Sequence, residues 1–177
     1  MRTRSQPANG AAVFSVLKRV DIRLDDLKGH AIQDLLRQHL DAMHQHSPPE
    51  SVHALDLEAL CHPSIRFWTA WESGELLGCG ALKRLNPEHG ELKSMRTADA
   101  HLRKGVGRAL LRHIESEART EGILRLSLET GPHAPFIAAR KLYANEGFVT
   151  CGPFADYAND PFSMFMTKLL TEAAPRG

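Results

Sequence analysis

Apolar and polar positions repeat with two different periods along the chain, and these periods predict its secondary structure. Apolar residues recur at helical spacing from Leu27 to Met43, behind Asp25 and Asp26, which we expect to cap that helix. Alternation with a period of two predicts strands elsewhere. We expect strands over residues 16–22, 65–71, 75–82, 91–97, 124–129 and 162–169, and helices over 27–43, 54–60, 107–122 and 135–147. This order of elements predicts a mixed α/β domain.

The composition is that of a soluble globular protein, with 42% hydrophobic and 24% charged residues among 177. We expect one domain over residues 14–172, with a disordered arm at 1–13 and a tail at 173–177. The net charge of +1 provides no basic field for nucleic acid, and no apolar run approaches the roughly 20 residues that cross a membrane. The three cysteines are odd in number and far apart, so we expect reduced thiols in a cytoplasmic protein.

A turn of glycines and basic residues, Arg103-Lys104-Gly105-Val106-Gly107-Arg108, leads into the helix predicted at 107–122. The N-terminus of a helix offers unpaired N–H groups and a partial positive charge, which suit a phosphate. Arg108 and Arg112 would oppose the helix dipole, and a bound anion would offset that cost. The alternative interpretation is a glycine-bearing turn beside a solvated basic face.

Two motifs carry a resemblance to a known family. Residues 102–107, Leu-Arg-Lys-Gly-Val-Gly, resemble the diphosphate-binding motif of the GNAT superfamily of N-acetyltransferases, Gln/Arg-x-x-Gly-x-Gly/Ala, although Leu102 departs from the pattern. Residues 142–148, Leu-Tyr-Ala-Asn-Glu-Gly-Phe, are similar to the family's Leu-Tyr-x-x-x-Gly-Phe and follow the first motif after one strand. The resemblance extends roughly from Val16 to Leu169, and segments around Ser47 and Pro153 look like those of a subgroup of small bacterial acetyltransferases.

The resemblance implies a GNAT fold, in which helices flank a central mixed, mostly antiparallel sheet with splayed fourth and fifth strands. It implies direct transfer of an acetyl group from acetyl-CoA to a primary amine of a small molecule or peptide, with no metal. The pantetheine arm would lie between the splayed strands, where the Met95 amide would polarise the thioester carbonyl. The implied cofactor-binding residues are Met95, Arg96, Thr97, Leu102, Arg103, Lys104, Gly105, Val106, Gly107 and Arg108. Members of the family often form homodimers, although no segment here indicates one.

The resemblance also implies an acid and a base. An alkylamine with a pKa near 10.4 is neutral in only about one molecule in 2,500 at pH 7, so a general base is valuable. Glu91 matches the family's base, with an exposed strand-end carboxylate as the alternative, and Glu129 is the second choice. Tyr143 matches the general acid that protonates the departing thiolate. Packing of Phe148 against Tyr143 in a helix cap would also explain an aromatic residue there.

The remaining polar residues have simpler interpretations. His44 and His46 are two apart on a predicted helix and therefore point in different directions, which argues against a metal site. Trp68 and Trp71 are expected to pack in the core and against the sheet. Five residues fall in segments that flank the acceptor pocket in the family, and their acids are more often surface charges: His53, Asp56, Glu58, Asp156 and Tyr157. A non-catalytic acyl-CoA sensor would need neither Glu91 nor Tyr143, so the presence of both favours an enzyme.

Overall fold

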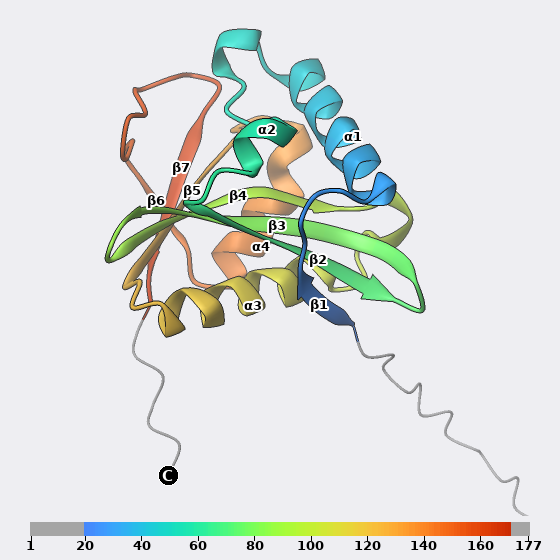
Figure 1. The fold of residues 1–177 in the computed structure, drawn as a ribbon. Helices are drawn as coiled ribbons and strands as arrows, with labels where there is room; N and C mark the ends of the chain where they lie inside the picture. Colours follow the sequence, from blue (N-terminus) through green and yellow to red (C-terminus); the bar gives the residue numbers. More distant parts are fainter. Residues whose placement is uncertain (1–19, 171–177) are drawn as a thin grey trace, which may run out of the picture.

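The computed structural model describes residues 20–170, which form a seven-stranded sheet with helices on both faces (Figure 1). The strand order is β1-β2-β3-β4-β5-β7-β6, and every neighbouring pair is antiparallel except β4 and β5. The strands are β1 Asp21–Leu24, β2 Ile65–Glu72, β3 Glu75–Asn86, β4 His89–Thr97, β5 Arg125–Thr130, β6 Val149–Cys151 and β7 Met164–Leu169. The α-helices are α1 His30–His46, α2 Leu57–Leu60, α3 Val106–Thr120 and α4 Ile137–Asn145, with short 3-10 turns at Pro49–Ser51, Asp99–His101 and Ala134–Phe136.

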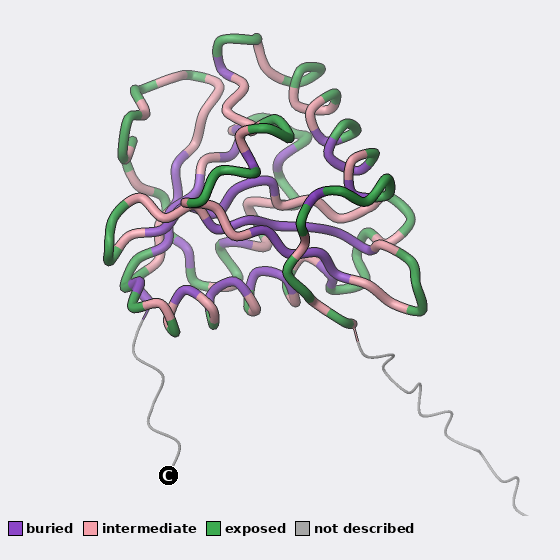
Figure 2. Tube along the Cα trace, viewed as in Figure 1, coloured by how far each residue is buried: buried purple, intermediate pink, exposed green. Residues whose placement is uncertain are grey.

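Each face of the sheet has its own apolar core. On one face, α1 packs Ile32, Leu35 and Leu36 against Phe67 and Ala81 of the sheet. On the other face, α3 buries a stripe of apolar residues at the helical spacing that the sequence predicted, and Tyr143 and Phe148 complete this core. Figure 1 shows α1 and α2 on the side of the sheet opposite α3, and Figure 2 shows burial concentrated in the central strands. The arrangement is the mixed, mostly antiparallel sheet that the resemblance implied.

The gap between β4 and β5 is the feature of the sheet that matters most for function. The two parallel strands pair only from His89 with Arg125 to Leu92 with Leu128. Beyond that point β4 continues to Thr97 and β5 to Thr130 without pairing with each other, so the two strands splay apart. A bulge in β4 coincides with the start of the gap, because two residues, Ser94 and Met95, lie opposite one residue of β3, and Ser94 has a φ of 52°.

Two predictions about the N-terminal third were wrong in detail. Within the described residues the first strand is Asp21–Leu24, so it ends two residues later than the predicted 16–22; residues 16–19, with the predicted arm and the 173–177 tail, lie outside the described residues. The first helix begins at His30, with Gly29 as its N-cap, and not at Leu27 behind Asp25 and Asp26. Asp25 instead accepts a hydrogen bond from the amide of Leu27, whose φ of 64° ends any helix there, and another from the Thr69 hydroxyl.

The other elements follow the predictions with shifted ends. The short helix begins at Leu57, three residues later than expected, because Asp56 caps it by accepting a hydrogen bond from the Ala59 amide at 2.8 Å. The last helix is preceded by a 3-10 turn at Ala134–Phe136. The expected packing role of Trp68 is confirmed, since it is fully buried in the core.

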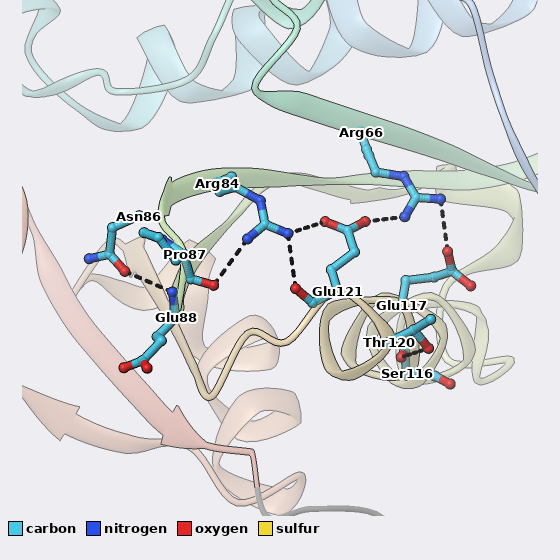
Figure 3. Close-up of polar contacts among 9 residues, drawn as sticks. All are labelled: Arg66, Arg84, Asn86, Pro87, Glu88, Ser116, Glu117, Thr120 and Glu121. Atoms are coloured by element: carbon cyan, nitrogen blue, oxygen red, sulfur yellow. Dashed lines mark hydrogen bonds and ion pairs between the residues drawn. The ribbon is translucent and has the colours of Figure 1, made fainter.

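A network of ion pairs ties α3 to the sheet on the face away from α1 (Figure 3). The carboxylate of Glu121 lies between the guanidinium groups of Arg66 and Arg84, accepting from both. Arg66 also donates to Glu117 at 2.8 Å, and Arg84 donates to the Pro87 carbonyl at 3.0 Å. Burial acts to raise the pKa of Glu121, but the hydrogen bonds from the two arginines outweigh it and leave that pKa below its usual value.

No helix among residues 20–170 is long and apolar enough to span a membrane. All three cysteines are free thiols. Cys79 is completely buried, and burial raises the pKa of its thiol to about 12.

Candidate active site

The turn before α3 has the geometry of an anion-binding cradle. Arg103 and Gly105 have left-handed φ values of 61° and 83°, and Gly105 is the N-cap of α3. The first amide that reaches back four residues is that of Ala109, which donates to the Gly105 carbonyl at 3.0 Å, so the amides of residues 106–108 precede the helical hydrogen bonds. Val106 points its side chain into the core and therefore has only its backbone to offer a ligand. Leu102, the departure from the motif, is 52% exposed.

The basic residues around this turn divide into two groups. Arg108 and Arg112 both pair with Glu146, at 2.9 and 2.8 Å, so the interpretation that they require a bound anion is not needed to explain them. Arg103 and Lys104 are exposed and form no ion pair with any other described residue. Of the four basic residues, only Arg103 and Lys104 can therefore bind an anion at the turn without first giving up an ion pair within the protein.

A cavity of about 260 Å³ passes through the gap between β4 and β5. It is lined from one face of the sheet by α1, including His39 and Met43, and from the other by α4, including Tyr143. Its walls between the helices come from residues 92–96 of β4 and residues 129–131 at the end of β5. The segment 51–54 and Phe162 close the remaining side. The cavity thus brings together Tyr143, Glu129, Met95 and Arg96 from three separate stretches of sequence.

Tyr143 lies at the C-terminal cap of α4 and lines the first cavity. Gly147 is left-handed, with a φ of 92°, and the Phe148 amide donates to the Tyr143 carbonyl at 3.0 Å, as in a Schellman motif. The Phe148 ring packs against the Tyr143 ring with their centroids 5.8 Å apart. The capping contact is therefore confirmed, and the same tyrosine lines the cavity. Burial, with a smaller contribution from the charge of Glu129, raises the pKa of Tyr143, so its phenol is protonated at neutral pH.

Glu91 is buried, with 2% of its surface exposed, so the alternative of an exposed strand-end carboxylate is wrong. Its Oε1 accepts a hydrogen bond from the Tyr157 hydroxyl at 2.6 Å and lies 3.2 Å from Lys93 Nζ. Lys93 Nζ also donates to the Tyr157 hydroxyl and to the His53 carbonyl, both at 2.9 Å. Glu91 does not line the cavity that contains Tyr143, whereas Lys93 and His53 do.

Glu129, the second candidate base, lines that cavity directly. Its Oε1 accepts a hydrogen bond from Ser163 Oγ at 2.9 Å. Burial raises the pKa of Glu129 and outweighs the lowering effects of the Ser163 hydrogen bond and of the nearby His53 and Lys93. A carboxylate with a raised pKa is a stronger base than an exposed one.

A second cavity, of about 650 Å³, lies beyond the Glu91–Tyr157 pair. Four carboxylates line it, those of Glu50, Glu91, Asp156 and Asp160, against the single ammonium of Lys83. It shares Ser51, His53 and Phe162 with the first cavity, so these residues form a common wall. Of the residues expected to flank an acceptor pocket, His53, Asp156 and Tyr157 line this cavity, whereas Asp56 and Glu58 do not.

The two histidines at the end of α1 do not act together. Both are exposed, but His46 lines the first cavity and contacts the Phe136 ring edge-on at 6.4 Å, whereas His44 does not line that cavity. Within residues 20–170 no group of three His, Cys, Asp or Glu side chains is placed to hold a metal ion.

Sequence reasoning missed three polar residues of the first cavity. His39 lies among the buried residues of α1 and belongs to no recognisable motif. Ser94 occupies a bulge that no local sequence pattern indicates. Lys93 lies in the polar strand, but nothing distinguished it from its neighbours in sequence. The unusual polarity of residues 91–97 was the one available signal. Its cause is that Glu91 and Lys93 pair with each other and with Tyr157, far along the chain.

Comparisons with known proteins agree with this geometry. The family model described as the acetyltransferase (GNAT) family matches residues 30–148. The chain is 58% identical to the uncharacterised N-acetyltransferase YsnE of Bacillus subtilis over 149 residues, which cover 84% of this chain and 99% of that protein. An acetyltransferase structure from Streptococcus agalactiae superposes with a TM-score of 0.65 at 22% identity, covering 85% of this chain and 98% of that one. A GNAT family acetyltransferase from Elizabethkingia anophelis with acetyl-CoA bound gives a TM-score of 0.60 at 18% identity, with 85% and 98% covered. The chain therefore belongs to the acetyltransferase (GNAT) family, whose members are enzymes of acetyl transfer.

Proposed function

We propose that this protein transfers the acetyl group of acetyl-CoA directly to a primary amine, in the cavity between β4 and β5. The observation that carries the proposal is the continuity of the site. Strand pairing ends at Leu92, Tyr143 and Glu129 line the opening beyond it, and the free amides before α3 follow β4 along the chain.

The residues present fit the cosubstrate. The amides of residues 103–107 would hold its diphosphate, with Arg103 and Lys104 as cations nearby. The unpaired edge of β4 after Leu92 would bind the amide groups of the pantetheine arm as another strand would. Gly78 of β3 lets the end of β4 and the start of α3 pack closely against β3, since a Cβ there would lie 2.6 Å from the Arg96 carbonyl oxygen and 3.2 Å from Val106 Cγ1. When bound, acetyl-CoA supplies the activated acetyl group.

Glu129 and Tyr143 are suited to move one proton each. In the proposed reaction the amine nitrogen forms a bond to the acetyl carbon as the carbon–sulfur bond breaks. Glu129 accepts the proton lost by nitrogen, and Tyr143 donates a proton to sulfur. Burial and, to a smaller extent, the negative charge of Glu129 raise the pKa of Tyr143. Neutralising Glu129 would therefore make the phenol a better acid as the thiolate forms.

Between the two candidate bases, the geometry favours Glu129. Glu91 is held by Tyr157 and Lys93 and faces the second cavity, so it would reach an amine beside Tyr143 only through its partners. Glu129 shares the cavity with Tyr143 and needs no relay. Neither cavity is lined by Cys61, Cys79 or Cys151, which supports transfer without an acyl-cysteine intermediate.

The experiment that tests this function combines binding with turnover. Calorimetric titration with acetyl-CoA should give one site per chain, and a free-CoA assay across amino acids, polyamines, aminoglycosides and peptides should find an acceptor. Tyr143→Phe should retain the binding and lose the turnover. Binding without turnover of any amine would contradict the enzymatic proposal and favour a sensor.

A further inference from the structure

Three of the described residues that line the first cavity each have a buried polar atom without a partner. Among residues 20–170 no hydrogen bond is made by His39 Nδ1, Ser94 Oγ or Arg96 Nε. His39 and Ser94 are only 9% and 8% exposed, so water does not readily compensate them. A buried polar group without a partner costs roughly 1–3 kcal/mol, and such groups call for a specific explanation. Since all three residues line the same cavity, the simplest explanation is a ligand.

The chemistry of these atoms points to an anion. Arg96 Nε and Ser94 Oγ are hydrogen-bond donors, and His39 Nδ1 is a donor in one tautomer. Burial, together with the nearby charges of Arg96 and Lys93, lowers the pKa of His39 to about 4, so the imidazole is neutral at pH 7. The positive charges therefore come from the arginine and the lysine.

The charge of Arg96 is less compensated than that of Lys93. Lys93 is paired with the buried carboxylate of Glu91 at 3.2 Å. Arg96 pairs through Nη2 with Asp99, whose side chain is 74% exposed and therefore screened by water. An ammonium group placed against His39, Ser94 and Arg96 would be repelled by the guanidinium, whereas a carboxylate would satisfy the donors.

We propose that His39, Ser94 and Arg96 bind a carboxylate of the acetyl acceptor, which is therefore a small amino acid or another amine that carries a carboxylate. This inference rests on the proposed acetyl transfer. Glu129 and Tyr143 line the same cavity, so the amine of such an acceptor would face them while its carboxylate faces α1 and the β4 bulge. The cavity of about 260 Å³ suits a small acceptor rather than an aminoglycoside.

Matched acceptors test the proposal. Amino acids, their carboxamides and the corresponding decarboxylated amines are compared in the free-CoA assay at saturating acetyl-CoA. We expect kcat/KM to be roughly 10- to 100-fold higher for the carboxylates, the range for a charge-assisted hydrogen bond. Equal values for the three series, or a preference for polyamines, would overturn the inference while leaving acetyl transfer intact. Failure of every amine would contradict the transferase function itself, and this inference with it.

Variants identify the residues. Arg96→Gln and Ser94→Ala should reduce the preference for the carboxylate about tenfold or more, with little change in the KM for acetyl-CoA. Arg96→Lys should recover part of the preference, since it retains the charge without the fork of donors. Arg66→Gln is the matched control, because that arginine lies in the network of Figure 3 and should leave the preference unchanged. A rise in the KM for acetyl-CoA with an unchanged preference would show that the three atoms bind pantetheine instead, and would overturn the proposal.

Discussion

The ion-pair network beneath α3 and the wall of the cavity at the β4 bulge both place polar groups against the apolar core, yet they differ in how those groups are satisfied. In the network, Arg66, Arg84 and Glu121 each have at least two charged or carbonyl partners. On the cavity wall, His39 and Ser94 are more deeply buried and have an atom with no partner in the described part of the chain.

This difference separates stability from function. A satisfied network adds stability and fixes the position of α3, whereas unsatisfied buried groups reduce stability and persist where they serve a ligand. Substitutions in the network should therefore lower the free energy of unfolding without changing the chemistry. Substitutions on the cavity wall should lower turnover with little loss of stability.

The largest effect is expected at Tyr143. Tyr143→Phe removes the proposed proton donor but retains the ring that packs on Phe148. Turnover should fall roughly 100- to 10,000-fold, the usual range for a general acid, while the affinity for acetyl-CoA and the melting temperature stay near those of the parent. Free-CoA release measures the turnover, and calorimetry measures the affinity and the melting temperature. Unchanged turnover would remove the tyrosine from the mechanism.

Glu129→Gln should lower turnover about 100-fold. Because burial raises the pKa of Glu129 above 4.5, kcat/KM of the parent should fall as the pH drops through that raised value, and this acid limb should disappear in the variant. The pH dependence of kcat/KM, measured for the parent and for Glu129→Gln at a subsaturating concentration of the acceptor, tests both expectations.

Glu91→Gln is the comparison for that experiment. It leaves Lys93 buried without its charge partner and should cost roughly 3–5 kcal/mol of stability. Its turnover per folded molecule should remain above that of Glu129→Gln. The reverse order would make Glu91 the base.

In the network, Glu121→Gln should lower the free energy of unfolding by about 1–2 kcal/mol at pH 7, because two arginines lose their shared carboxylate. The folded-state pKa of Glu121 is lowered, so its contribution is complete above about pH 4.5 and is lost as the pH falls toward the folded-state value. Urea unfolding at several pH values measures the difference, which should shrink in acid. Glu88→Gln, a nearby carboxylate with no partner among residues 20–170, should change little.

The smallest effect is expected on the free energy of unfolding, when each of two buried serines on neighbouring strands is replaced by alanine. The Ser127 hydroxyl on β5 contacts Thr167 Oγ1 at 2.9 Å and His89 Nε2 at 2.8 Å, whereas the Ser94 hydroxyl on β4 has no described partner. Ser127→Ala should cost about 1 kcal/mol, and Ser94→Ala should be neutral or slightly stabilising. Chemical denaturation of both variants measures this, and an equal cost would mean that Ser94 is satisfied in solution.

Local signals account for what the sequence predicted well. Gly122 and Gly147 adopt the left-handed conformation that commonly ends a helix, Gly105 is left-handed in the turn before α3, and the apolar stripe of α3 is buried as expected. These features depend on neighbours within a few residues. The motif at 142–148 was likewise sufficient to place Tyr143 in a helix cap.

The parts that escaped prediction depend on contacts between distant residues. Glu91 was expected to be either a general base or an exposed strand-end carboxylate, and neither alternative included the hydrogen bond from Tyr157, 66 positions later. The unpaired state of His39 follows from the position of α1 over the β4 bulge, which no local pattern indicates. The early start assigned to α1 failed because Asp25 bonds to Thr69 of β2 and forms a turn instead of a cap.

The position of the thioester in a crystal structure with acetyl-CoA bound would test the central claim most directly. We expect the acetyl group inside the cavity between β4 and β5, with the sulfur within hydrogen-bond distance of the Tyr143 hydroxyl. A thioester that lay outside this cavity, or that turned away from Tyr143 and Glu129, would contradict the account.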